Sequence, residues 1–258
     1  MTTKLRVLDL NLWNINEPLE ARMIGLVKAL TELSPDIVCL QEVSPHPMTG
    51  VPQSEMLRAA SQYPFGVYRK TGHWKGREEG LAILSKYPLL SVEQHFLSPA
   101  PEDMARQVVL AEIELDGHKV LVGNTHLAYR VDMTSVRRHQ VEELLACIDK
   151  RCDDNKIATT VLCGDFNDTP TSSPVTAVLL NKHELANVFY GKEPTSDPFT
   201  FSSRNPLASA ELGLDRWIDY IFTTKDLAVA NRLVVFDTDD RYGYVSDHFG
   251  LFVELELT

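Results

Sequence analysis

The stretch Gly164-Asp165-Phe166-Asn167-Asp168 places acidic and amide side chains directly after a short apolar run. That run, residues 158–163, contains β-branched and apolar residues and predicts a buried strand. The Gly, Asp and Asn residues then favour a turn. Asp165 and Asn167 would therefore stand at the end of a rigid element, which suits a reacting group. A turn in which Asp and Asn cap their own backbone explains the same residues equally well.

Polar side chains recur at this kind of position along the chain. The following residues lie within, at the end of, or directly beside a predicted strand: Asn11, Glu42, His126, Asp165, Asn167, Asp219, Asp247 and His248. Because strands of one sheet bring their ends together, we expect these side chains to form a cluster. Taken singly, a turn Asn, a solvated Glu and a structural His are the more common interpretations.

The cluster has an oxygen-rich part and two histidines. The oxygen donors are Asn11, Glu42, Asp165, Asn167 and Asp247. Carboxylate and amide oxygens without cysteine favour Mg²⁺ or Mn²⁺ over Zn²⁺. The two histidines suit acid–base chemistry near neutral pH, and Asp219 is the natural orienting partner for one of them. Together these groups suit metal-assisted hydrolysis of a phosphate ester.

Apolar and alternating runs predict the strands that would position this cluster. They cover residues 5–10, 37–40, 65–69, 80–85, 89–97, 105–115, 118–127, 158–163, 217–222, 229–236 and 249–257. Apolar residues at helical spacing predict helices over residues 17–33, 56–63, 134–150 and 173–180. Strands interleaved with helices indicate an α/β protein. Because no repeat or linker is visible, we expect a single domain over residues 1–258.

Residues 70–79 are expected to form a loop rich in Gly, Lys, Arg and Glu, with His73 and Trp74 at its centre. Beside a phosphate site, Trp74 and Arg77 could stack on a substrate or clamp it. A solvated hairpin tip accounts for the same composition. Glu79 closes this segment, at the entry of the next predicted strand.

Composition limits the classes of partner. The chain has 258 residues and a formal net charge of −11. Bulk charge therefore does not draw it to DNA, RNA or an anionic membrane, so local cations or a metal would have to bind a phosphate substrate. No signal-peptide core, membrane-length apolar run or C-x-x-C pair is visible. We expect a cytoplasmic monomer with reduced thiols and without stable membrane insertion; a precursor trimmed of its signal peptide fits the same sequence.

Seven segments together resemble the endonuclease/exonuclease/phosphatase superfamily, which includes deoxyribonuclease I. In chain order they are LNLWN, LQEV, EGLAILS, NTHL, GDFND, RWIDYIF and SDH. Each segment alone is weak, but the ordered set from Leu8 to His248 is specific. The resemblance implies a four-layer α/β sandwich, in which two mixed β-sheets pack face to face between helices. It also implies one site at the sheet ends.

The resemblance implies roles for the oxygen donors. Glu42 would be the main ligand of Mg²⁺, or of Mn²⁺, helped by Asn11 and Asp247. Asp165 would position or deprotonate the attacking water. Asn167 would hold the phosphate.

It likewise implies roles for the remaining candidates. His248, oriented by Asp219, would stabilise the phosphorane or act as the base. His126 would stabilise the leaving-group side or a non-bridging oxygen, with Glu79 supporting it. Arg106 would contact the phosphate. Which histidine is the acid and which the base differs between branches of the superfamily.

The branch of the superfamily decides the substrate. The NTHL segment is similar to the deoxyribonuclease I, sphingomyelinase and deadenylase branches, whereas abasic-site endonucleases usually have a tyrosine there. The GD-x-N-Y-R element of inositol 5-phosphatases is absent, because Asp168-Thr169-Pro170 follows Asn167. We therefore expect a phosphodiesterase or nuclease acting on DNA, RNA or a nucleotide. The alternatives are a sphingomyelinase-type enzyme acting on a phospholipid headgroup, a phosphatase, or, more remotely, a non-catalytic binding module.

Overall fold

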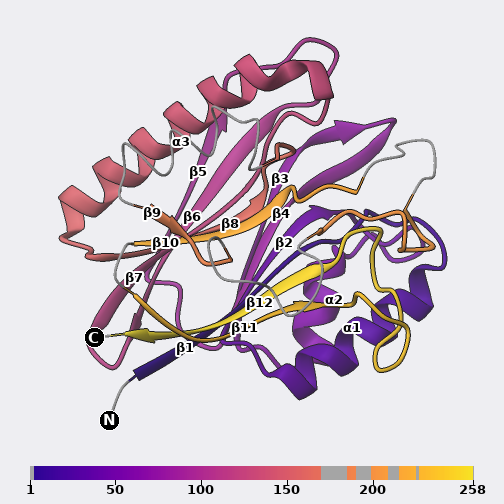
Figure 1. The fold of residues 1–258 in the computed structure, drawn as a ribbon, viewed down its shortest axis with the longest axis horizontal. Helices are drawn as coiled ribbons and strands as arrows, with labels where there is room; N and C mark the ends of the chain where they lie inside the picture. Colours follow the sequence, from indigo (N-terminus) through magenta and orange to yellow (C-terminus); the bar gives the residue numbers. More distant parts are fainter. Residues whose placement is uncertain (1–2, 170–184, 190–198, 209–214, 225–226, 258) are drawn as a thin grey trace.

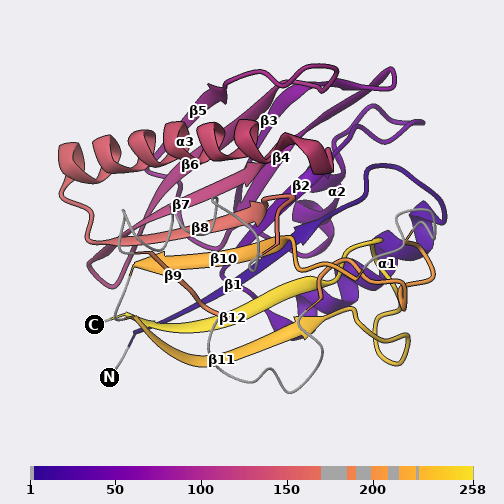
Figure 2. The same ribbon diagram turned by 45° about the horizontal axis from the view of Figure 1, so that its top comes forward.

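The fold consists of two six-stranded β-sheets that pack face to face, with helices on the outer faces (Figure 1, Figure 2). The computed structural model describes residues 3–169, 185–189, 199–208, 215–224 and 227–257. The predicted helix over residues 173–180 lies outside these ranges.

The first sheet contains both chain ends of the described part. Its strands are β1 (Thr3–Asn11), β2 (Ile37–Val43), β3 (Phe65–Trp74), β4 (Arg77–Ser85), β11 (Ala228–Val235) and β12 (Gly250–Leu257). They lie in the order β11-β12-β1-β2-β4-β3. Only β1 and β2 run parallel within this sheet.

The second sheet comes from the middle of the chain. Its strands are β5 (Ser91–Leu97), β6 (Arg106–Leu115), β7 (His118–His126), β8 (Thr159–Asp165), β9 (Leu185–Asn187) and β10 (Asp219–Thr224). They lie in the order β5-β6-β7-β8-β10-β9, with β7 and β8 as the parallel pair. Each sheet therefore has one parallel pair near its centre, and the carboxyl ends of the two pairs carry Asn11, Glu42, His126 and Asp165.

The inner faces of the sheets form a continuous apolar layer. Side chains at alternate positions of each strand point into it. Its fully buried members include Leu5, Val7, Ile37, Cys39, Val120, Val122, Val161, Cys163, Ile221 and Val253. All four cysteines are free thiols.

Helices cover the outer face of each sheet. Helices α1 (Leu19–Leu33) and α2 (Gln53–Ala60) pack on the first sheet, and α3 (Thr134–Asn155) packs on the second (Figure 1). The order of layers is therefore helix, sheet, sheet, helix, which confirms the predicted four-layer α/β sandwich. Among the described residues, no helix combines the length and apolar character needed to cross a membrane.

The prediction of a loop over residues 70–79 was wrong, because most of this segment belongs to the two strands of a β-hairpin. Strand β3 continues to Trp74 and β4 begins at Arg77. Lys75 and Gly76 make the turn with φ angles of 47° and 81°. Two successive positive φ values match the right-handed twist of the flanking strands. Lysine is an unusual residue at such a position, so the usual Asn-Gly or Asp-Gly signal is missing here.

Candidate active site

Asn11 joins the two sheets at the edge where the parallel pairs end. Its Nδ2 donates to Oε1 of Glu42 in the same sheet and to Oδ2 of Asp165 in the other, each at 3.1 Å. Its Oδ1 accepts from the backbone N–H of Trp13 at 2.9 Å, which fixes the orientation of the amide. Asn11 is fully buried. One amide therefore holds two carboxylates at a set separation across the junction between the sheets.

Unusual backbone conformations aim the side chains at this edge. Glu42 and Asn167 have φ angles of 51° and 53°. Such values are uncommon for non-glycine residues and cluster at functional sites. The β2–β4 register also shifts between Leu40 and Val43, so Glu42 leaves the regular in-and-out alternation. The backbone N–H of Asn167 donates to Oδ1 of Asp165 at 2.8 Å, and this hydrogen bond fixes the position of Asn167.

Gly164 allows β7 and β8 to approach closely just before Asp165. Its φ is 148°, and a Cβ placed there would collide with the carbonyl oxygen of Thr125. Only glycine fits this combination of conformation and space. Glycine at position 164 is therefore required to place the Asp165 carboxylate at the end of β8.

His248 is paired with Asp219 in a buried environment. Its Nδ1 lies 2.8 Å from Oδ2 of Asp219, and its ring packs edge-on against Phe201 at 5.2 Å between ring centroids. Burial alone would lower the pKa of His248, but the carboxylates of Asp219 and Asp247 outweigh it and raise this pKa well above its usual value. The imidazolium form is therefore favoured. Its Nε2 lies 3.9 Å from Oδ2 of Asp165 and from Oδ1 of Asp247.

His126 has the opposite electrostatic character. Its Nδ1 lies 4.0 Å from Oε1 of Glu79 and its Nε2 lies 3.6 Å from Oδ2 of Asp165. Burial, and then the positive charges of Arg106 and His248, hold the pKa of His126 well below its usual value. The site thus contains one histidine that favours the charged form and one that favours the neutral form, a difference typical of acid and base partners.

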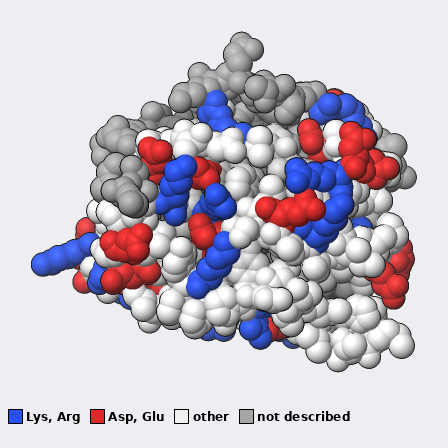
Figure 3. Space-filling model, turned by 90° about the horizontal axis from the view of Figure 1, so that it is seen from below, with Lys and Arg blue, Asp and Glu red and all other residues white. Residues whose placement is uncertain are grey.

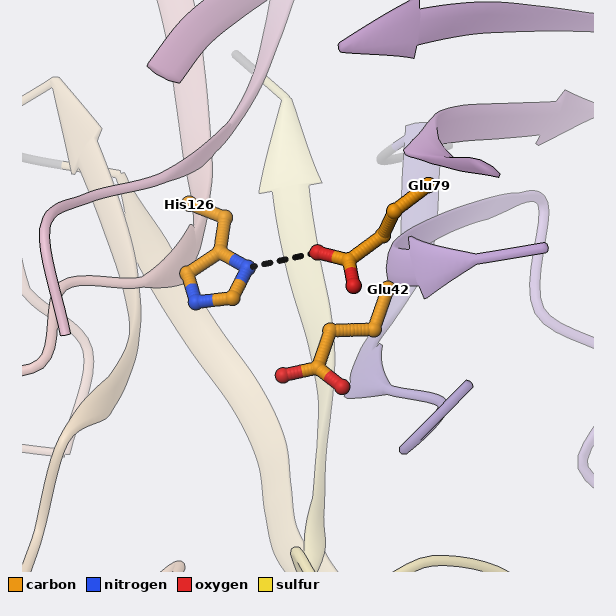
Figure 4. A group of neighbouring side chains, drawn as sticks. All are labelled: Glu42, Glu79 and His126. Carbon is orange, nitrogen blue, oxygen red and sulfur yellow. Dashed lines mark ion pairs between the residues drawn. The ribbon is translucent and has the colours of Figure 1, made fainter. Parts of the chain in front are cut away.

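Glu79 and Glu42 face His126 across the junction between the sheets. Figure 4 shows the three side chains directed into one space, with the dashed line joining His126 and Glu79. Burial and the neighbouring Glu42 carboxylate raise the pKa of Glu79 to about 8. Asn14 fixes the second oxygen of Glu79 through its Nδ2 at 3.2 Å. Glu79 therefore comes from the first sheet to support a histidine of the second.

The carboxylates fit a divalent cation. One ligand atom from each of Glu42, Glu79 and His126 lies within 4.8 Å of the others. Burial and the facing Glu42 carboxylate raise the pKa of Asp247 to about 7, against the opposing charge of His248. Burial and the Asp219 carboxylate raise the pKa of Asp165 to about 7. Neighbouring buried carboxylates repel one another, and a hard cation such as Mg²⁺ would relieve this repulsion.

Two cavities meet at the cluster. The larger has a volume of about 520 Å³ and the smaller about 380 Å³. They share four lining residues, Glu42, His126, Tyr129 and Asp247. The larger is also lined by Trp13, Trp74, Arg77 and Arg106, and the smaller by Asn167, Phe201, Arg216 and His248. A group bound at Glu42 and His126 would therefore have space on both sides.

The structure brings every sequence-predicted site residue to these two cavities or to the groups that line them. Trp74, Arg77 and Arg106 lie in the wall of the larger cavity. Arg106 is almost completely buried and forms two hydrogen bonds with Asp103, at 2.8 and 3.1 Å. Its charge is therefore largely compensated within the fold.

Sequence reasoning missed Arg22, a buried arginine of α1. Its guanidinium donates to the backbone oxygens of Leu12, Asn14 and Asn16 and to that of Val245 at 3.0 Å. These hydrogen bonds therefore connect the loop after Asn11 to the loop before Asp247. The signal was available, because Arg22 follows Leu19 by three residues and falls on the apolar stripe of the helix.

Surface charge is mixed outside the cavities. On the face drawn in Figure 3, Lys and Arg side chains are interspersed with Asp and Glu side chains. On this face both signs of charge are present, although the whole chain has a formal net charge of −11. This view shows no broad basic face. On this face, an anionic substrate would be attracted by individual Lys and Arg side chains.

Two proteins of Drosophila melanogaster are similar to this chain. Protein angel is 29% identical over 167 residues, which cover 60% of this chain and 46% of that protein. Nocturnin is 24% identical over 280 residues, which cover 92% of this chain and 42% of that protein. The chain spans less than half the length of these curated relatives.

Solved structures share the fold across almost the whole chain. The human Nocturnin catalytic domain with bound sulfate anion has a TM-score of 0.79 and 20% identity, covering 99% of this chain and 95% of that one. An endonuclease/exonuclease/phosphatase from Bacteroides vulgatus has a TM-score of 0.79 and 21% identity, covering 99% and 100%. The model of the endonuclease/exonuclease/phosphatase family matches residues 11–248, which include all the candidate residues. This chain therefore belongs to the endonuclease/exonuclease/phosphatase family.

Proposed function

We propose that the protein is a divalent-metal-dependent phosphoester hydrolase that acts on nucleic-acid or nucleotide phosphodiesters. The observation that carries the proposal is the convergence of two histidines on Asp165. Its Oδ2 lies 3.6 Å from Nε2 of His126 and 3.9 Å from Nε2 of His248. Family membership supports phosphoester chemistry, and the sulfate bound by the human Nocturnin domain supports binding of a tetrahedral anion by this fold.

Glu42 and Asp247 would hold the cation. Both line the two cavities, and both offer the hard oxygen donors that Mg²⁺ prefers, with Mn²⁺ as an alternative. When bound, the ion would supply Lewis-acid stabilisation of charge on a phosphoryl oxygen. Asn11 has its amide oxygen committed to the N–H of Trp13. This geometry favours Asn11 as the residue that orients Glu42 over Asn11 as a direct ligand.

Asp165 and the two histidines would move and hold the protons. Asp165, with a pKa of about 7, is suited to accept a proton from an attacking water near neutral pH. His248 would donate a hydrogen bond from Nε2 to a phosphoryl oxygen, while Asp219 holds its Nδ1. Neutral His126 would contact another oxygen of the same phosphate. Asn167 would use its amide to hold the phosphate beside Asp165.

The two-sided site favours a diester over a monoester. The cavities extend from the shared residues Glu42 and His126 in two directions, so each ester substituent of a phosphodiester has its own space. A phosphomonoester would fill only one side. Each binding interaction with the second substituent can add to the affinity for the transition state.

A substrate panel with metal controls tests the proposal. It contains single- and double-stranded DNA, RNA, 5′-tyrosyl-DNA, sphingomyelin vesicles, inositol phosphates and bis(p-nitrophenyl) phosphate, each with Mg²⁺, Mn²⁺ or EDTA. We expect EDTA-sensitive cleavage of a nucleic acid or nucleotide, weakened by added salt when binding limits the rate. Cleavage of sphingomyelin and of no nucleic acid or nucleotide would contradict the proposed substrate and favour a lipid phosphodiesterase. Metal binding without turnover of any phosphoester would favour a binding module.

Two substitutions connect turnover to the cluster. Glu42→Gln and His248→Asn should each lower turnover by at least about 10²-fold, because each removes a group that contacts the reacting phosphate or its cation. Glu20→Gln and His139→Asn change the same residue types at exposed positions and should leave turnover unchanged. Full activity in either site variant would contradict the assignment.

A further inference from the structure

Three aromatic residues line the larger cavity. Trp13 comes from the loop after β1, Trp74 from the end of β3, and Tyr129 from the loop after β7. The rings of Trp74 and Tyr129 are in edge contact, with 5.1 Å between centroids and 69° between planes. The ring of Trp13 is backed by the guanidinium of Arg22 at 5.0 Å. Three elements therefore hold partly exposed ring surfaces around one space.

Two cations stand at the rim of this cavity without acidic partners. Lys75 and Arg77 are exposed, at the turn of the β3–β4 hairpin and directly after it. Nζ of Lys75 lies 5.6 Å from the Trp74 ring centroid, and Arg77 donates to Oδ1 of Asn16 at 3.3 Å. Within the part of the chain that the structure describes, neither cation forms an ion pair with a carboxylate. Both charges therefore remain available to an anionic ligand.

Two other cations near the site differ in this respect. Arg106 is paired with Asp103 at 2.8 Å. Arg130 is paired with Glu102 and Asp132, at 3.0 and 3.2 Å. Arg216, in the wall of the smaller cavity, also forms no ion pair with a described carboxylate, and its guanidinium lies 5.1 Å from the Phe201 ring centroid. At the larger cavity, two such cations occur beside three aromatic rings, so stacking surfaces and positive charge occur together there.

We propose that the larger cavity is a nucleotide subsite, in which the aromatic walls stack a nucleobase and Lys75 and Arg77 bind a phosphate flanking the scissile one. This assignment rests on the proposed function. The volume of about 520 Å³ falls in the usual range of roughly 300–1,000 Å³ for small-molecule sites. The cavity contains Glu42 and His126 in its wall, so a bound nucleotide can extend its phosphate to them. Stacking tolerates any base, so the subsite selects a nucleotide over a base-free ester and does not read sequence.

Calorimetric titration tests the base independently of turnover. Adenosine 5′-monophosphate and ribose 5-phosphate share the sugar phosphate and differ by the base. With EDTA-treated protein we expect the nucleotide to bind about 5- to 150-fold more tightly, the range for one base stacked on an aromatic side chain. Trp74→Ala should reduce this ratio toward one, and Trp74→Phe should retain most of it. Phe96→Ala, at an exposed aromatic position of β5, should leave it unchanged.

Adenosine 3′,5′-bisphosphate tests the flanking phosphate. We expect it to bind more tightly than the monophosphate at low salt, and the Lys75→Ala, Arg77→Ala double variant should lose this advantage. In hydrolysis, Trp74→Ala should raise KM for the p-nitrophenyl ester of thymidine 5′-monophosphate, with little effect on methyl p-nitrophenyl phosphate.

The outcomes separate the subsite from the reaction. Equal affinity for the nucleotide and the base-free phosphate would overturn the subsite, even if phosphodiesters are cleaved in a metal-dependent way. An unchanged ratio in Trp74→Ala would overturn it as well. Base-dependent binding through Trp74 without hydrolysis of any phosphoester would instead uphold the subsite and reject the proposed hydrolase.

Discussion

Nδ1 of His248 lies 2.8 Å from Oδ2 of Asp219, and both side chains are almost completely buried. The carboxylate fixes the ring orientation and favours the imidazolium. Asp219→Asn keeps the shape and removes the charge, so we expect turnover to fall by about 10²- to 10⁴-fold. The fold should persist, because the first residue of β10 keeps its strand pairing. Steady-state kinetics and circular dichroism measure the two effects.

Asp240→Asn, at an exposed position, is the matched control and should be active. The pH dependence of turnover in Asp219→Asn distinguishes loss of the Asp219 charge from a change in packing. Loss of the Asp219 charge should move the basic limb of the profile to lower pH, because the pKa of His248 would fall. An unchanged limb with reduced turnover would show that Asp219 acts only through packing.

Gly164→Ala should displace Asp165. The added Cβ would collide with the carbonyl oxygen of Thr125 in the neighbouring strand, and the φ of 148° disfavours any side chain. We expect a loss of stability of more than about 2 kcal/mol, together with a loss of turnover. Gly117→Ala tests a positive φ in open space and should cost only about 1 kcal/mol. Urea denaturation of both variants gives the comparison, and equal losses would contradict the collision argument.

Arg22→Met should destabilise the protein by at least about 2 kcal/mol. The change leaves buried carbonyl oxygens in two loops without their donor. Arg22→Lys keeps the charge but cannot reach the same set of acceptors, so it should be intermediate. Arg138→Met, at an exposed position of α3, should change the free energy of unfolding by less than about 0.5 kcal/mol. If Arg22→Met unfolds like the wild type, Arg22 does not fasten the loops.

Metal-free protein should lose stability as the pH rises. The folded-state pKa values of Asp165 and Glu79 are raised to about 7 and about 8, whereas both groups titrate near pH 4 when unfolded. The stability from their neutral forms is fully present below about pH 4 and is lost as the pH rises through about 7 and 8. The lowered pKa of His126 acts in the opposite direction below about pH 6.5, where the unfolded histidine is protonated. We therefore expect Tm in EDTA to decrease from about pH 6.5 to about pH 8.5.

Mg²⁺ should oppose this decrease, because it stabilises the charged carboxylates, so its effect on Tm should grow with pH. Glu79→Gln should flatten the pH dependence in EDTA, since the amide does not titrate. A Tm in EDTA that rises over this range would contradict the assigned direction of the pKa shifts.

The fold could be predicted from the sequence because its strands are strongly patterned. Buried strands such as β2 and β8 are apolar runs bounded by turn residues, and α1 has a regular apolar stripe. For residues 70–79 the sequence left a loop and a hairpin tip open, and the extension of β3 to Trp74 and of β4 back to Arg77 was missed because polar residues hide the alternation. The exact extent of α3 was missed for a related reason, since residues 151–155 are polar apart from Cys152 yet continue the helix.

The site could be predicted only as a set of positions. The sequence placed Glu42 after a strand, but the register shift and positive φ that turn it outward depend on tertiary pairing with β4. It also assigned Asn11 as an oxygen donor to the cation, and the residue types alone do not indicate that its Nδ2 donates to both Glu42 and Asp165. Arg22 was overlooked although its place on the apolar stripe of α1 marks it as buried, because its partners are backbone oxygens and residue types do not identify them.

The hydrogen bond from Asn11 to Asp165 crosses from one sheet to the other. The proposed reacting groups are divided in the same way, with Glu42 on one sheet and His126 on the other. If these residues act as proposed, turnover should therefore depend on the spacing between the sheets. A volume change in the shared apolar layer, for example at Val161, should alter the rate from a distance. Selection on activity would then act on the thickness of the interior as well as on the residues that contact the substrate.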